Sequence, residues 1–284
     1  MIEVSSKLAS FLTDTGSNIR KIVSVQCRNM RNHIFRKNAR LIVVFKNVYG
    51  WVLNSFFFKK REPKRELEDT SLRKKELALA VIERLKIAYP DSGCSLDYDE
   101  AWKLLVSVRL AAQCTDARVN VVVEDLYAKF PDINALANAD VDEIEAIVRP
   151  CGLGKSKARD ISACMRMLRD DFNCKVPDDF DALLSLPGVG RKSANLIMGD
   201  VFGKPAIVTD THCIRLSNRI GLVNGIKDPK KVEMELWKLV PPEEGNSLCH
   251  RFVDHGRAIC TARTKPYCDK CCLSDICKSA FSIG

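Results

Sequence analysis

The stretch Leu186-Pro187-Gly188-Val189-Gly190-Arg191-Lys192-Ser193-Ala194 places two glycines, one residue apart, between two segments with helical periodicity. We expect one helix over residues 179–185 and another over 193–201. Glycine permits a tight turn and a close approach of the backbone to a partner, and the N–H groups of the turn and of the second helix start would point at one spot. The pattern therefore predicts a hairpin between two helices that binds phosphate through main-chain donors and reads no base sequence.

Two interpretations of the hairpin residues stay open. Gly188 and Gly190 also suit an ordinary packing junction, but Leu-Pro before them and Arg191-Lys192 after them favour a DNA contact. Lys192 lies in the first turn of the expected second helix. One interpretation of Lys192 is an exposed phosphate contact. The other is a nucleophile, because a helix N-terminus and a neighbouring cation disfavour the charged form of the amine.

A second candidate residue is Asp210, within Val208-Thr209-Asp210-Thr211-His212 and 18 residues after Lys192. An aspartate directly before a helix usually caps that helix. The alternative is a carboxylate that faces Lys192. Sequence spacing alone does not decide between the two.

Helical periodicity continues through most of the chain from about residue 76. Apolar residues recur at helical spacing over residues 77–88, and further apolar helical runs follow over 102–110, 140–147 and 154–167. No run of alternating β-branched residues bounded by turns is long enough to predict a sheet. The sequence therefore predicts an all-α fold.

Five of the 13 cysteines fall between residues 260 and 277. The spacing Cys260-x7-Cys268-x2-Cys271-x5-Cys277 supplies four soft thiolates within reach of one metal centre. A zinc site and a cuboidal iron–sulfur cluster both suit such a set. The other eight cysteines are scattered singly, which predicts free thiols and an intracellular, reducing compartment.

The net charge of +9 is concentrated at the N-terminus. Residues 1–74 hold 16 Lys/Arg against 6 Asp/Glu, and the remaining 210 residues hold 29 against 30. We expect residues 1–75 to be a basic extension and linker, for which a transit-type segment, a nucleic-acid-binding arm and a poorly folded leader all suit the composition. The apolar run over 41–58 is interrupted by Lys46, two asparagines and Gly50, so we expect no membrane span.

Together these motifs resemble endonuclease III of the helix–hairpin–helix glycosylase superfamily. The likeness covers about residues 76–284 and includes the segments over 112–116 (AQCTD) and 152–158 (GLGKSKA) besides the hairpin, VTDTH and the cysteine spacing. The resemblance implies a helical barrel domain over 97–207 that carries the hairpin. It also implies a second helical domain that joins 76–96 to 208–284, with DNA in the cleft between them. We expect a monomer.

The resemblance also implies the chemistry. In this family the lysine matching Lys192 attacks C1′ of a damaged nucleotide, and the aspartate matching Asp210 activates that amine and stabilises the oxocarbenium-like transition state. The expected activity is that of a bifunctional DNA glycosylase and AP lyase. It excises oxidised pyrimidines from double-stranded DNA and cuts 3′ to the abasic site by β-elimination through a Schiff base. A water-using mismatch glycosylase and a DNA-binding module without catalysis are the alternatives.

Base extrusion and DNA binding are implied for further residues. Family residues matching Gln113 and Leu153 fill the space that the extruded base leaves, although an interior amide and a core leucine are equally ordinary roles. Gly188, Gly190 and Arg191 are the expected contacts to the DNA backbone.

The resemblance implies a [4Fe–4S] cluster on Cys260, Cys268, Cys271 and Cys277. The x2 and x5 gaps favour Cys271 over the adjacent Cys272 as the third ligand. One departure stands out: the family's first gap has six residues, and this chain has seven (TARTKPY). The cluster is expected to fix the C-terminal loop, which offers Arg263 and Lys265 to phosphates.

Overall fold

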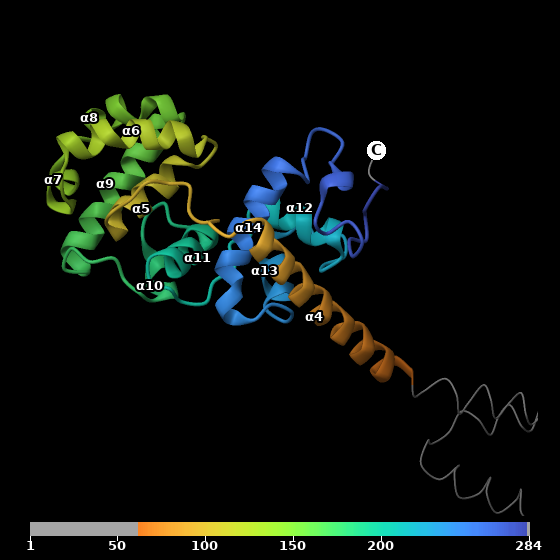
Figure 1. The fold of residues 1–284 in the computed structure, drawn as a ribbon. Coiled ribbons are helices and arrows are strands. Elements are labelled where there is room, and N and C mark those ends of the chain that lie inside the picture. Colours follow the sequence, from red (N-terminus) through yellow and green to blue (C-terminus); the bar gives the residue numbers. More distant parts are fainter. Residues whose placement is uncertain (1–61, 283–284) are drawn as a thin grey trace, which may run out of the picture. The chain divides into compact units, whose positions relative to one another are not determined.

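The computed structural model describes the backbone of residues 62–282 and the side chains of residues 71–282. Within these residues the fold is all-α, with helices and short 3-10 turns and no strand, as predicted (Figure 1). The elements are α4 (Glu62–Ala88), α5 (Ala101–Leu110), α6 (Asp116–Lys129), α7 (Ile133–Asn138), α8 (Val141–Val148), η1 (Arg149–Cys151), α9 (Gly154–Asp171), α10 (Phe180–Ser185), α11 (Arg191–Asp200), α12 (Thr211–Ile220), α13 (Pro229–Leu236), η2 (Pro242–Glu244), α14 (Gly245–Ala258) and η3 (Cys268–Lys270).

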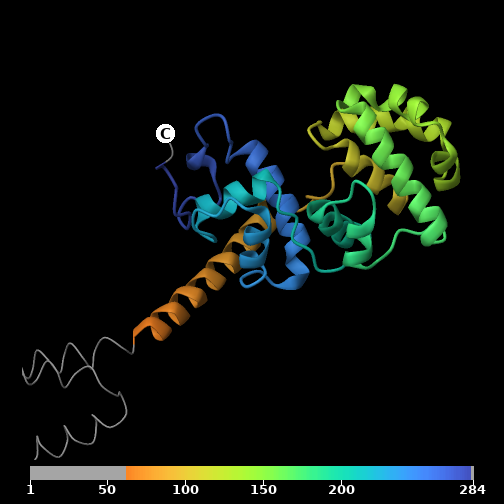
Figure 2. The same cartoon turned by 180° about the vertical axis from the view of Figure 1, so that it is seen from behind.

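Buried apolar side chains form two cores. The first core extends from Leu96 to Ile197 and is supplied by α5–α11. The second joins residues 78–85 of α4 to residues 207–273, which include α12–α14. Figures 1 and 2 show the two groups of helices from opposite sides, with α5–α9 gathered apart from α12–α14.

By its contacts the chain separates into residues 1–68 and 69–284, and both cores lie in the second unit. The predicted division of 97–207 from 76–96 and 208–284 stays a prediction. The expected extension and linker over 1–75 overlaps α4, which begins at Glu62. Pro63 does not prevent this, since proline is tolerated in the first turn of a helix, where its missing N–H has no intrahelical acceptor.

Local signals account for the helices around the hairpin. Asp179 caps α10 by accepting a hydrogen bond of 2.9 Å from the backbone N–H of Ala182. The second helix begins at Arg191, two residues before the predicted start, so that Gly190 is its N-cap. Lys192 is accordingly the second residue of α11.

Polar contacts connect the first core to the second. Arg191 at the start of α11 forms a bidentate ion pair with Glu233 of α13, with nitrogen–oxygen distances of 2.6 and 2.7 Å. At the other end of α11, one oxygen of Asp200 lies 2.7 Å from a nitrogen of each of Asn246 and His250. Both ends of α11 are therefore fastened to helices of the second core.

No helix within the described residues is long and apolar enough to cross a membrane. The apolar run over 41–58 and most of the basic extension over 1–75 lie outside the described residues.

Candidate active site

The turn of the hairpin requires glycine at position 188. Gly188 has a φ of +78°, and a Cβ atom there would lie 2.9 Å from Cβ of Asp160 and 3.0 Å from Cδ of Arg109. Arg109 and Asp160 form an ion pair between α5 and α9. The hairpin is thus packed directly against the first core at a position where only a hydrogen side chain fits.

Gly190 is different, because nothing in the fold demands a glycine there. Its φ is −101°, which any residue adopts, and a Cβ atom would meet nothing within 4 Å. No side chain caps α11, so the first N–H groups of this helix have no capping oxygen. Unsatisfied N–H groups at a helix N-terminus form a binding site for an anion such as phosphate.

The side chain of Arg191 does not lie free beside this turn. Its guanidinium is bound by Glu233, whose side chain is 2% exposed, and it lies over the ring of Phe180. The hydrogen bond to Glu233 raises the pKa of Arg191 above its ordinary value. A DNA contact by Arg191 is therefore better supplied by its backbone N–H than by its side chain.

Lys192 and Asp210 line one cavity of about 320 Å³. Lys192 comes from the start of α11, whereas Asp210 directly precedes α12. Other lining residues come from the segment before α5, the end of α5 and α14; they include Cys94, Ala111, Ala112, Cys114, His250 and Asp254. The structure thus brings the two predicted catalytic residues to the same cavity.

Asp210 is also the N-cap of α12. Its Oδ1 accepts a hydrogen bond of 2.7 Å from the backbone N–H of Cys213. The capping role and the role in the cavity are therefore compatible, because one oxygen can be fixed by the helix while the carboxylate faces the cavity. The positive end of the helix dipole also favours a negative charge at this position.

Asp116, His212 and Arg257 line the cavity together with Lys192, and the sequence assigned none of them a role. Burial would raise the pKa of Asp116, but hydrogen bonds from Ser95 and Arg257 and the charge of Lys192 hold it below its ordinary value. Burial lowers the pKa of His212, and Lys192 is among the nearby cations that lower it further. Asp116 and Arg257 are 141 positions apart, and they form an ion pair at the cavity wall.

Gln113 and Leu153 are neither an interior amide nor a core leucine. Both are exposed, Leu153 to 58%, and both adopt left-handed backbone conformations, with φ of 59° and 52°. Such conformations cost on the order of 1–3 kcal/mol for residues other than glycine and tend to occur at functional sites. Their exposure suits residues that enter a base stack, and that role stays a prediction.

The four predicted metal ligands line a second cavity. Cys260, Cys268, Cys271 and Cys277 surround it together with Arg219 and neighbouring loop residues. Within the described residues, no three His, Cys, Asp or Glu donors are grouped closely enough to hold one metal ion.

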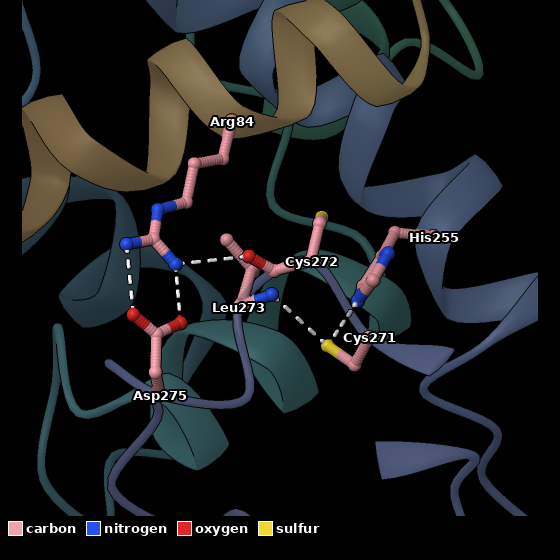
Figure 3. Close-up of polar contacts among 6 residues, drawn as sticks. All are labelled: Arg84, His255, Cys271, Cys272, Leu273 and Asp275. Carbon is pink, nitrogen blue, oxygen red and sulfur yellow. Dashed lines mark hydrogen bonds and ion pairs between the residues drawn. The ribbon is translucent and has the colours of Figure 1, made fainter. Parts of the chain in front are cut away.

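Hydrogen-bond donors lie close to two of these sulfur atoms. Nη1 of Arg219 lies 3.3 Å from Sγ of Cys260. The backbone N–H of Leu273 donates to Sγ of Cys271 at 3.4 Å, and Nε2 of His255 lies 3.3 Å from the same sulfur (Figure 3). Donors of this kind stabilise thiolates that ligate iron. The donor set therefore fits an iron–sulfur cluster.

His255 is buried, and burial lowers its pKa to about 4. Its Nδ1 lies 3.0 Å from the hydroxyl of Tyr89. A neutral ring that accepts from Tyr89 at Nδ1 donates from Nε2, which is the nitrogen that faces Cys271. When Cys271 is a thiolate, Nε2 is the nitrogen that donates to it, and Nδ1 then accepts from Tyr89.

The structure separates the adjacent Cys271 and Cys272. Cys271 lines the cavity with the other three cysteines, and Cys272 does not. The carbonyl of Cys272 instead accepts a hydrogen bond of 3.0 Å from Arg84, which also forms an ion pair with Asp275 (Figure 3). The C-terminal loop is thereby fastened to α4.

The longer first gap of the cysteine pattern is accommodated in a closed loop. Thr261 donates to the carbonyl of Thr264 at 3.0 Å, and the N–H of Tyr267 donates to the carbonyl of Ile259 at 3.1 Å. Arg263 and Lys265 are exposed on this loop.

The fold and the first cavity are those of a DNA repair protein that acts on bases. A family model described as HhH-GPD superfamily base excision DNA repair protein matches residues 106–242, which contain the hairpin, Lys192 and Asp210. Endonuclease III of Synechocystis sp. is 43% identical over 208 residues, 73% of this chain and 94% of the relative. Endonuclease III of Escherichia coli K12 is 37% identical over 200 residues, 70% of this chain and 94% of the relative.

A solved structure described as a trapped endonuclease III–DNA covalent intermediate matches with a TM-score of 0.70 at 37% identity, covering 73% of this chain and 97% of that one. The chain belongs to the endonuclease III family. It is a bifunctional DNA glycosylase and AP lyase of base excision repair, as the sequence motifs predict.

The two hairpin glycines give a matched pair of variants. Gly188→Ser should lower the free energy of unfolding by about 1–3 kcal/mol, because a side chain at this positive φ also meets Asp160 and Arg109. Gly190→Ser should leave stability unchanged or slightly raised, since serine is a preferred N-cap. It should nevertheless weaken DNA binding, because the serine oxygen takes the N–H groups that a phosphate would use.

Urea unfolding and fluorescence anisotropy with a DNA duplex measure the two effects. Undiminished DNA binding by Gly190→Ser would contradict the assignment of the hairpin as a phosphate site.

Proposed function

We propose that this enzyme removes oxidised pyrimidines from double-stranded DNA and cuts the strand 3′ to the abasic site through a Schiff base on Lys192. One observation carries the proposal: Lys192 and Asp210, supplied by different helices, line a single cavity of about 320 Å³. A cavity of that size accommodates one extruded base.

Lys192 is the proposed nucleophile. Its neutral amine attacks C1′ of the damaged nucleotide, and the bond between C1′ and the base breaks, with the electron pair leaving on the base. Opening of the sugar ring at C1′–O4′ gives a protonated imine. The imine acidifies the C2′ proton, and loss of that proton expels the 3′ phosphate oxygen. Lys192 is an exposed residue in the first turn of α11 and lines the cavity.

Asp210 is the proposed base and electrostatic partner. Its carboxylate takes a proton from the Lys192 ammonium and stabilises positive charge that develops on the sugar. The hydrogen bond from the N–H of Cys213 fixes the carboxylate before substrate arrives. Preorganisation of this kind is what makes a charge effective in a transition state.

The DNA partner is supported by the relatives. Two solved structures that match at 37% identity are described as endonuclease III–DNA complexes, one non-covalent and one a trapped covalent intermediate. A covalent intermediate in a relative supports a nucleophile on the enzyme over an activated water.

A [4Fe–4S] cluster is the proposed resident cofactor, held by Cys260, Cys268, Cys271 and Cys277. When bound it supplies a rigid anchor for the C-terminal loop rather than a redox step of glycosidic cleavage. The surrounding residues then present Arg263 and Lys265 to the DNA backbone.

Variants at the two catalytic positions test the proposed chemistry. Lys192→Gln should abolish strand cutting at an abasic site while DNA binding stays within a few-fold. Asp210→Asn should slow base release by about 10²–10⁴-fold. The fold should survive, because asparagine caps a helix as well as aspartate does, so this substitution removes the charge and keeps the cap.

Single-turnover assays on duplexes with an oxidised pyrimidine or an abasic site separate base release from nicking. Base release without nicking by the unaltered enzyme would favour a water-using glycosylase. Binding without base release or nicking would indicate a DNA-binding module, and strand cutting by Lys192→Gln at the unaltered rate would move the nucleophile elsewhere.

The adjacent cysteines provide a matched test of the cofactor. Cys271→Ser should lose iron and the yellow-brown colour of the protein. Cys272→Ser should keep about four irons per chain, because its thiol does not line the cavity. Iron analysis and visible absorbance of anaerobically prepared protein measure both. Stoichiometric zinc without iron would overturn the cluster assignment.

A further inference from the structure

Lys157 on α9 has no solvent-exposed surface. A lysine is almost never fully buried unless its charge is paired. Within residues 71–282, however, both acceptors of its side-chain hydrogen bonds are backbone carbonyls and no carboxylate is among them. Burial lowers the pKa of this ammonium, which reflects how costly its position is. The burial of the Lys157 ammonium therefore calls for a structural or functional explanation.

The two acceptors are the terminal carbonyls of two helices. Nζ of Lys157 lies 2.7 Å from the carbonyl oxygen of Leu110, the last residue of α5, and 2.9 Å from that of Cys151, the last residue of η1. Terminal carbonyls have no intrahelical donor, and at an α-helix end they carry the negative end of the helix dipole. Two helix ends thus take the place of a carboxylate.

Both helix ends lead directly into loops with left-handed residues. Gln113 follows Leu110 by three residues, and Leu153 follows Cys151 by two. The backbone N–H of Lys157 also donates to the carbonyl of Leu153 at 3.0 Å. The two side-chain hydrogen bonds of Lys157 therefore connect the starts of two loops that are some forty positions apart in the sequence.

The Gln113 loop borders the catalytic cavity. Ala111, Ala112 and Cys114, which flank Gln113, line the cavity together with Lys192 and Asp210. Gln113 and Leu153 themselves are exposed. Exposed side chains on strained backbone hold their direction only when the surrounding structure fixes them. An apolar side chain held in this way can enter a base step of DNA.

We propose that Lys157 is a positioning residue for base extrusion: it ties the Gln113 loop to the Leu153 loop so that both side chains enter the base stack together. Lys157 touches neither DNA nor the reacting atoms, and it acts only through the two loops. The inference rests on the proposed removal of a base from duplex DNA.

Lys157→Met keeps an unbranched buried side chain and removes all three side-chain donors. It should slow base release from a duplex with an oxidised pyrimidine on the order of 10–100-fold. Strand cutting at a preformed abasic site should change far less, because no base has to leave the stack. A fluorescent 2-aminopurine opposite the lesion should also brighten less, which reports extrusion directly.

Lys155→Met is the matched control. Lys155 lies two positions earlier on the same helix, and its side chain is exposed. It should behave as the unaltered enzyme on both substrates. Unaltered enzyme that releases no base would refute the proposed function itself. The inference about Lys157 alone would be overturned by equal losses on the two substrates, or by no loss on the lesion.

Lys157→Gln is the second variant, in which a shorter amide retains donors but does not span both carbonyls. It should fold and show an intermediate loss on the lesion substrate. If neither variant folds, Lys157 is a requirement of the core rather than of the loops, and the proposal is wrong.

Discussion

The ion pair between Arg191 and Glu233 is the interaction on which the site depends. Glu233 is nearly completely buried, so it needs the guanidinium, and removing one partner of such a pair typically costs about 3–5 kcal/mol. Arg191 is the first residue of α11, and α13 with Glu233 belongs to the second core. The pair therefore fixes the start of α11 against the second core, which also contains α12 and its cap Asp210. Lys192 directly follows Arg191 in the sequence, so its position is fixed as well.

The catalytic cavity combines two helix N-termini. Lys192 lies in the first turn of α11, and Asp210 caps α12. On helix α9, Lys157 connects the starts of the Gln113 and Leu153 loops, and Asp160, three residues later, pairs with Arg109 beneath Gly188.

Local patterns predicted the all-α fold, the hairpin with a helix on each side, and the cysteine set, because each depends on residues close together in the sequence. Contacts between distant segments could not be predicted in this way. Periodicity gives no sign that Lys157 bridges two helix ends, or that Arg257 pairs with Asp116. Arg191 was expected to contact DNA, because no pattern near it in the sequence indicates the ion pair with Glu233. The spacing favoured Cys271 over Cys272 as a ligand, but only the structure shows that Cys271 lines the cavity and Cys272 does not.

Catalysis through Lys192 requires that its amine forms a bond to the sugar, and locating that bond is the direct test. Borohydride reduces a protonated imine to a stable amine, so enzyme incubated with abasic duplex and borohydride should become covalently joined to DNA. Protease digestion and mass spectrometry of the adduct should place the modification on Lys192, in the peptide that follows Arg191. A modification on another lysine, or no adduct from enzyme that still cuts the strand, would show that Lys192 is not the nucleophile.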